Sequence, residues 1–191
     1  MRFRRLYMNL FRMFAVCTLG LGLVIGSIQA ADAVKSGPQV EEKVPGPFHP
    51  LNVTGENAGQ KSCLFCSNGD NPVAVIFARN PDESLTKLIK KIDEATAKNS
   101  SSKMGSYVVF LSDSQDLEGK LKAMATKENV KNTILSIDNP AGPERYKISK
   151  DADITVLLYT GRVVKANHAF KGALKDADIE KITGDISKIT K

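Results

Sequence analysis

The sequence predicts an α/β protein built in three layers around a central mixed sheet. Three observations support this prediction. Short apolar runs alternate with amphipathic segments of helical period, which is typical of a mostly parallel sheet covered by helices. The last two apolar runs lie too close together for a helical crossover, so they should form an antiparallel hairpin. A final stripe at helical spacing predicts a closing helix.

The first 30 residues have the layout of a secretory signal peptide. Four arginines near the start precede an apolar stretch from Met13 to Ile28, and small residues follow it. We expect cleavage near Ala30 or Ala31, in preference to a retained membrane anchor, with Cys17 leaving in the leader. The mature protein should then be exported to the periplasm or the extracellular space, with no membrane attachment after cleavage.

Removing the leader also removes most of the net positive charge. The formal charge of +6 falls to +2 without the four leader arginines. Nucleic-acid binding needs a clustered basic surface, and the remaining lysines are interspersed with Asp and Glu, so no nucleic-acid partner is expected. The remaining chain of about 160 residues is long enough for one domain with a core of its own.

Residues 31–70 are expected to form an irregular N-terminal arm. Four prolines lie between positions 38 and 50, and no apolar period is present. This arm carries the Cys-x-x-Cys pair, Cys63 and Cys66. We expect at most one turn of helix there, because Ser67-Asn68-Gly69 would end it at once.

Regular structure is expected from residue 71 to the C-terminus. The run Val73–Ala78 predicts a strand buried on both faces. Asn80 is the expected helix cap and Pro81 the first helical residue, with Glu83 as a capping-box partner. The buried stripe of that helix is expected at Leu85, Leu88, Ile89, Ile92 and Ala95.

The same pattern then repeats before the order changes. Tyr107–Leu111 and Thr133–Ile137 are the next two expected strands, and they flank a helical stripe at Leu117, Leu121, Met124 and Ala125. Ile154–Tyr159 and Val163–Phe170 are the expected hairpin strands. Asp176 and Asp178 favour the start of the last helix, whose stripe comprises Leu174, Ile179, Ile182, Ile186 and Ile189.

This order of elements resembles the thioredoxin-like superfamily, in the form shared by peroxiredoxins and exported thiol-disulfide proteins. The stretch "YKISKDADITVLLYTGRVVKANHAF" is similar to the family's passage into its hairpin, and "GALKDADIEKI" to its closing helix. The resemblance covers about residues 71–190. It implies a thioredoxin-like three-layer sandwich for residues 71–191.

The chain departs from the family at the positions that carry its chemistry. The family places its reactive cysteines after the first core strand, where this chain has Asn80-Pro81-Asp82-Glu83. The family's cis-proline would fall near Ile154, where no proline stands. The resemblance therefore implies neither a peroxidase nor an ordinary thioredoxin, and fold alone does not define function.

The Cys63/Cys66 pair leaves three hypotheses open. In the first, the pair exchanges with the dithiol or disulfide of a protein partner, with Cys63 as the attacking and Cys66 as the resolving catalytic residue. In the second, it is a structural disulfide in a non-catalytic binding module. In the third, it holds copper or zinc together with His168, the histidine expected in the second hairpin strand. The leading hypothesis needs no cofactor and no metal.

Overall fold

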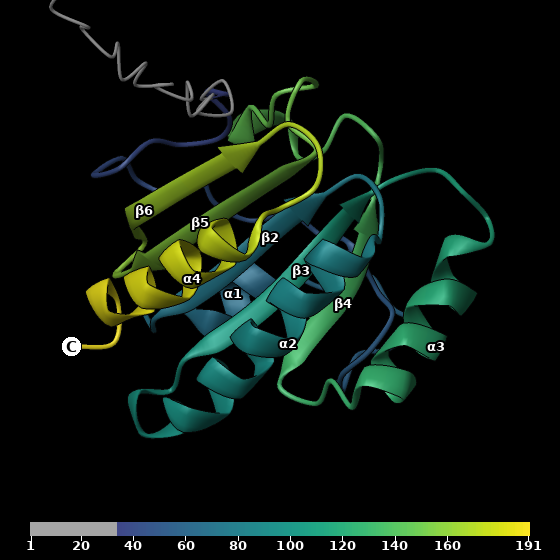
Figure 1. Ribbon diagram of the computed structural model, residues 1–191, viewed down its shortest axis with the longest axis horizontal. Helices are drawn as coiled ribbons and strands as arrows, with labels where there is room; N and C mark the ends of the chain where they lie inside the picture. Colours follow the sequence, from purple (N-terminus) through teal and green to yellow (C-terminus); the bar gives the residue numbers. More distant parts are fainter. Residues whose placement is uncertain (1–33) are drawn as a thin grey trace, which may run out of the picture.

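The computed structural model describes residues 34–191, so the predicted signal peptide and Cys17 lie outside the described residues. A six-stranded sheet in the order β1-β4-β3-β2-β5-β6 forms the centre of the molecule (Figure 1). Its strands are β1 (Leu51–Asn52), β2 (Val73–Ala78), β3 (Gly105–Leu111), β4 (Thr133–Asp138), β5 (Ile154–Thr160) and β6 (Val163–Phe170). Within residues 34–191, no helix is long and apolar enough to cross a membrane.

The strand directions confirm the predicted mixed sheet. Strands β2, β3 and β4 are parallel, whereas β5 pairs antiparallel with both β2 and β6. Strand β1 was not predicted, and it pairs antiparallel with the outer edge of β4. Its Asn52 is buried and donates a hydrogen bond from Nδ2 to Ser62 Oγ.

Helices α2 (Glu83–Lys98), α3 (Leu117–Glu128) and α4 (Asp176–Gly184) pack on one face of the sheet. A short 3-10 helix, η1 (Ser100–Ser102), follows α2, and another, η3 (Asp185–Lys188), extends α4. Figure 1 shows α2 and α4 in front of the sheet and α3 beside β4. The apolar stripes predicted for these helices lie in the cluster that they share with the sheet.

The predicted start of α2 was wrong by two residues. Asp82, not Asn80, is the N-cap: its backbone is extended, and its Oδ1 accepts a hydrogen bond from the N–H of Leu85 at 2.7 Å. The carboxylate also accepts a bond from Ser84 Oγ. Asp82 therefore satisfies an amide that the helix leaves without a partner, and its charge suits the helix start.

The opposite face of the sheet is covered mainly by the N-terminal arm rather than by long helices. Val73, Val75 and Phe77 of β2 point into this second apolar cluster, while the intervening residues point into the first. The cover comprises arm residues, the five-residue helix α1 (Leu64–Asn68), and residues around the 3-10 helix η2 (Glu144–Tyr146). Its apolar side chains are Val44, Phe48, Leu64, Phe65, Tyr146 and Ile148.

Asp93 of α2 holds the beginning of β4 in place. Its Oδ1 accepts the backbone N–H groups of Lys131, Asn132 and Thr133 at 3.0, 2.6 and 2.7 Å, and its Oδ2 accepts Asn132 Nδ2. The side chain is buried. A carboxylate that satisfies several buried donors fixes the helix against the sheet, because each donor would otherwise be desolvated without a partner.

We expect Asp93→Ala to lower the free energy of unfolding by about 2–4 kcal/mol, since it leaves three backbone donors without an acceptor. Chemical denaturation followed by circular dichroism measures the change. The matched control is Glu94→Ala at the neighbouring exposed position, which should change stability by less than about 0.5 kcal/mol. Equal effects of the two variants would contradict this role for Asp93.

Candidate functional site

The two cysteines lie on the face of the sheet opposite helices α2 and α4, towards the amino ends of β2 and β3. Phe65 of α1 packs in the second apolar cluster, and the Arg162 guanidinium, from the turn between β5 and β6, lies 5.2 Å from its ring centroid. The Asn68 side chain lies directly against Gly105, the first residue of β3, where a Cβ would clash with it. The pair is therefore at the other end of the strands from the start of α2.

Cys63 and Cys66 form a disulfide that spans the first turn of α1. Their Cα atoms are 5.2 Å apart. Cys63 is the N-cap of the helix, and its Sγ accepts a hydrogen bond from the backbone N–H of Cys66 at 3.1 Å. The helix ends at Asn68, with Gly69 as its C-cap. The single short turn expected from the sequence is confirmed, but the N-cap role of Cys63 was not predicted.

Helix α1 is held in place by contacts that do not involve sulfur. Leu64 and Phe65, the residues between the two cysteines, are buried at 2% and 5% exposure. The carbonyl of Asp70, just after the helix, accepts a hydrogen bond from the N–H of Gly161 at 2.9 Å, and Asp70 also forms an ion pair with Arg162. These contacts present the disulfide on a fixed support, with Cys66 exposed to solvent.

Three buried tyrosines lie in the second apolar cluster with Leu64 and Phe65, and none of them can act as a base near neutral pH. Burial raises the pKa of Tyr159 to about 12 and raises the pKa values of Tyr107 and Tyr146 as well. The hydroxyl oxygens of Tyr107 and Tyr159 are 3.4 Å apart. All three hydroxyls therefore stay protonated, and any exchange chemistry here depends on the sulfur atoms.

Arg79 lies between β2 and the Asn80–Glu83 segment that leads into α2, and it has a structural role. Arg79 donates from Nε to the carbonyl of Ala152 at 3.0 Å, from Nη1 to that of Pro140 at 3.0 Å, and from Nη2 to that of Ser149 at 3.1 Å. One guanidinium thus joins the carboxyl end of β2 to the loops before β5. These three bonds assign Arg79 the role of satisfying carbonyl groups.

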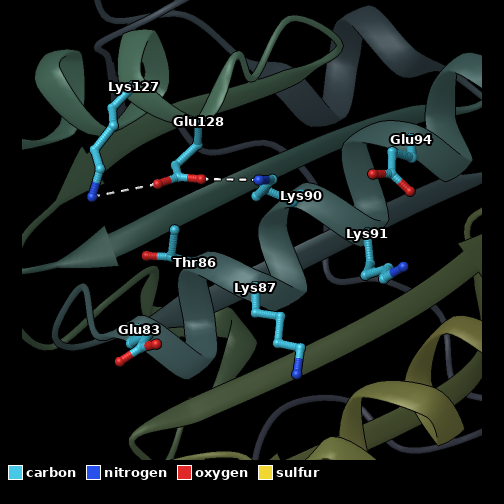
Figure 2. A pocket seen from close by; sticks show the side chains of 8 residues that line it. All are labelled: Glu83, Thr86, Lys87, Lys90, Lys91, Glu94, Lys127 and Glu128. Atoms are coloured by element: carbon cyan, nitrogen blue, oxygen red, sulfur yellow. Dashed lines mark ion pairs between the residues drawn. The ribbon is translucent and has the colours of Figure 1, made fainter.

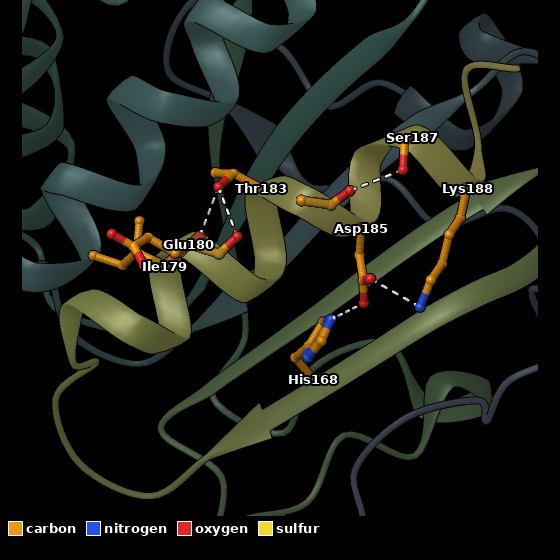
Figure 3. A network of polar contacts seen from close by, with 8 residues as sticks. His168, Ile179, Glu180, Thr183, Asp185, Ser187 and Lys188 are labelled. Carbon is orange, nitrogen blue, oxygen red and sulfur yellow. Dashed lines mark hydrogen bonds and ion pairs between the residues drawn. The ribbon is translucent and has the colours of Figure 1, made fainter.

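His168 lies in β6 as predicted, but not near the cysteines. Its ring is on the α4 side of the sheet, where Nε2 is 2.9 Å from Oδ2 of Asp185, which also pairs with Lys188 (Figure 3). The disulfide is on the opposite face. The structure therefore does not bring together the ligand set of the metal hypothesis, and among residues 34–191 no group of three His, Cys, Asp or Glu side chains could hold a metal.

Burial lowers the pKa of His168, although its contact with Asp185 acts in the opposite direction. Lys181 and Lys188 also disfavour the charged imidazole. For Asp185, burial raises the pKa, but hydrogen bonds from Lys188 and His168 outweigh it and leave the pKa below its ordinary value. The histidine is thus neutral at pH 7 and serves as a buried hydrogen-bonding group.

A surface hollow of about 740 Å³ lies between α2 and α3, on the face away from the disulfide (Figure 2). Three of its charged groups pair with one another: Glu128 contacts Lys90 at 3.0 Å and Lys127 at 3.6 Å. The hydrogen bond from Lys90 lowers the pKa of Glu128. Exposed ion pairs of this kind are common on protein surfaces and contribute little to stability. The lining residues are Glu83, Thr86, Lys87, Lys90, Lys91, Glu94, Lys127 and Glu128.

No family model matches the chain, and no curated protein matches it either. One similar solved structure is described as a thiol:disulfide interchange protein DsbE from Chlorobium tepidum; it is 15% identical with a TM-score of 0.59, and the match covers 83% of this chain and 99% of that one. Another is a secreted Mycobacterium tuberculosis disulfide oxidoreductase, which is 12% identical with a TM-score of 0.56, and the match covers 74% of this chain and 95% of that one. A third is a thiol peroxidase from Chromobacterium violaceum, which is 11% identical with a TM-score of 0.57, and the match covers 85% of this chain and 93% of that one.

These similarities, together with the sheet order, show that the chain has the thioredoxin-like fold predicted from its sequence. It differs from the family's site pattern in having Arg79 and the Asp82 cap where the reactive cysteines would stand. The cysteine pair was identifiable from the sequence, but the three carbonyl contacts of Arg79 were not predicted. The position of this arginine immediately after a buried strand was the only sequence signal for them.

Because Arg79 satisfies three carbonyl groups, we expect Arg79→Met to lower the free energy of unfolding by about 2 kcal/mol or more. The chemistry of the distant disulfide should be unaffected, so the rate at which glutathione reduces it should stay within about twofold of wild type. Lys91→Met, at an exposed position on α2, is the control for loss of a positive charge. A large change in the reduction rate would show that the start of α2 takes part in the site.

We expect the stability of the protein to fall as the pH drops from 7 to 5, partly because of His168. The lowered pKa means that the unfolded chain, with a histidine pKa near 6.5, binds more protons in this range than the folded chain. Acidification therefore favours unfolding. Denaturation at several pH values should show a shallower dependence of stability on pH for His168→Gln than for wild type, and an equal dependence would contradict this role for His168.

Proposed function

We propose that this protein is an exported thiol-disulfide exchange protein that acts on the dithiol or disulfide of a protein partner through Cys63 and Cys66. The observation that carries this proposal is an accessible disulfide on a firmly packed support in a thioredoxin-like fold. Cys66 is exposed, so an incoming thiolate can approach the bond without unfolding the domain. Reactive cysteines are typically solvent-accessible, whereas inert ones are buried.

The length of the enclosed loop also favours a reactive rather than a structural bond. The disulfide joins residues three apart in sequence. Closing so short a loop restricts the unfolded chain little, which corresponds to roughly 2 kcal/mol of stabilisation by the chain-entropy argument. The packed residues Leu64 and Phe65 hold the helix independently of this bond. Breaking and remaking it is therefore compatible with an intact fold.

Export is part of the proposal and is supported by two observations. The first is the signal-peptide pattern of residues 1–30, which would leave a mature chain that begins near Ala31. The second is that one of the similar structures belongs to a secreted disulfide oxidoreductase. Oxidising compartments outside the cytosol are where dithiol pairs are kept as disulfides.

The alternative is a non-catalytic binding module in which the disulfide is structural. It is favoured by Arg79, which ties the start of α2 to neighbouring loops where the family would have its reactive cysteines. In this alternative the cysteine pair would only stabilise the cover of the second sheet face. The two functions differ in one measurable property, the reduction potential of the pair.

We expect the pair to equilibrate with glutathione buffers at a reduction potential above about −300 mV, because structural disulfides in secreted proteins have lower potentials. Mass spectrometry after acid quenching and alkylation measures the reduced fraction. The purified protein should also oxidise a dithiol model peptide, and Cys63→Ser/Cys66→Ser should not. A potential below this value without exchange would favour the binding module.

A further inference from the structure

The two sulfur atoms of the disulfide have different environments. Cys66 is exposed to solvent, whereas Cys63 is only partly exposed and packs against the second apolar cluster. An attacking thiolate must approach one sulfur along the line of the S–S bond while the other sulfur leaves. Access therefore favours attack at Cys66, since the approach to Cys63 is restricted by the packed residues around it.

The hydrogen bonding of the pair supports the same direction of attack. The Sγ atom of Cys63 accepts the backbone N–H of Cys66 at 3.1 Å. A donor aimed at sulfur stabilises the negative charge that develops on that sulfur as the S–S bond breaks, which makes Cys63 the better leaving group. The sulfur that is harder to attack is thus also the one better prepared to leave.

We propose that Cys66 is the sulfur that bonds to the partner and that Cys63 is the leaving and resolving thiol. This inference rests on the proposed exchange function and reverses the roles expected from the sequence. It also reverses the usual order of a Cys-x-x-Cys pair, in which the first cysteine is assumed to attack. The local helix start resembles the usual arrangement, but the partial burial of Cys63 against the second apolar cluster exchanges the two roles.

The reaction balances without a cofactor. A partner thiolate attacks Cys66 Sγ, the Cys63–Cys66 bond breaks, and Cys63 leaves as a thiolate, which is protonated. The second thiolate of the partner then attacks the partner sulfur of the mixed disulfide and releases the Cys66 thiolate. The partner dithiol is oxidised to a disulfide, and this protein is reduced by the same two electrons. In the reverse direction Cys66 attacks first and Cys63 resolves the mixed disulfide.

Single-cysteine variants of the full chain test this assignment, with Cys17→Ser in every protein so that no third thiol reacts. The probe is glutathione disulfide, and the readout is the rate of mixed-disulfide formation measured by mass spectrometry. With each rate divided by the thiolate fraction of that variant at the pH used, so that only access is compared, we expect Cys63→Ser, which retains Cys66, to react about tenfold faster than Cys66→Ser, which retains Cys63. In 8 M urea the difference should largely disappear, because it arises from the fold.

A second measurement uses the intact pair. The oxidised Cys17→Ser protein is treated with reduced glutathione, quenched with acid and alkylated, and the glutathionylated residue is identified by peptide mapping. Glutathione found mainly on Cys66 supports the inference. Glutathione mainly on Cys63, or equal rates for the two folded single-cysteine variants, overturns it and leaves the exchange function standing. If the intact pair does not react at all, both the inference and the exchange function fail.

Discussion

Strand β2 is buried on both faces, and the need to cover it twice explains the arrangement of the rest of the protein. Each of its six residues is at most 1% exposed. Its alternate side chains belong to two separate apolar clusters. Helices α2 and α4 cover one cluster. The other is covered by the arm, helix α1 and the segment around Tyr146, so the chain before β2 is an integral part of the folded structure.

This requirement also determines where the cysteines lie. Leu64 and Phe65 contribute to the cover of the second face, and they separate Cys63 from Cys66 in sequence. Once these two side chains are buried, the disulfide must lie beside them, near the amino ends of the strands. The opposite end of β2 is occupied by the contacts of Arg79 and by the Asp82 cap. Packing and sulfur chemistry therefore depend on the same short segment.

Most of the fold could be predicted from local patterns. The run Val73–Ala78 and the later apolar runs identified five strands, because buried strands need continuous apolar residues. Strand β1 was missed because it has only two residues and depends on pairing with β4. The helix cap was placed at Asn80 because Asn80 and Asp82 are both capable of capping, and only the backbone conformation distinguishes them.

The candidate site was less predictable because it too depends on contacts between distant parts of the chain. The Cys-x-x-Cys pattern identified Cys63 and Cys66 as the candidate pair, but their position relative to α2 depends on how the arm crosses the sheet. That path is determined by side chains such as Val44 and Phe48, which have no periodic pattern in the sequence. His168 was placed in the correct strand, yet the face on which its ring lies depends on the register of β5 and β6, including its irregularity at Leu158/Tyr159.

The anchoring of helix α1 at both ends limits how much the surface can differ between the oxidised and reduced forms of the protein. Asn68 packs on Gly105, Asp70 bonds to Gly161, and Leu64 and Phe65, between the two cysteines, are buried, and none of these contacts requires the bond between the sulfur atoms. We therefore expect the surrounding backbone to keep its position when the bond opens. A protein that distinguishes the two forms would have to sense the thiol groups themselves, because the outline of the surface is nearly the same in both.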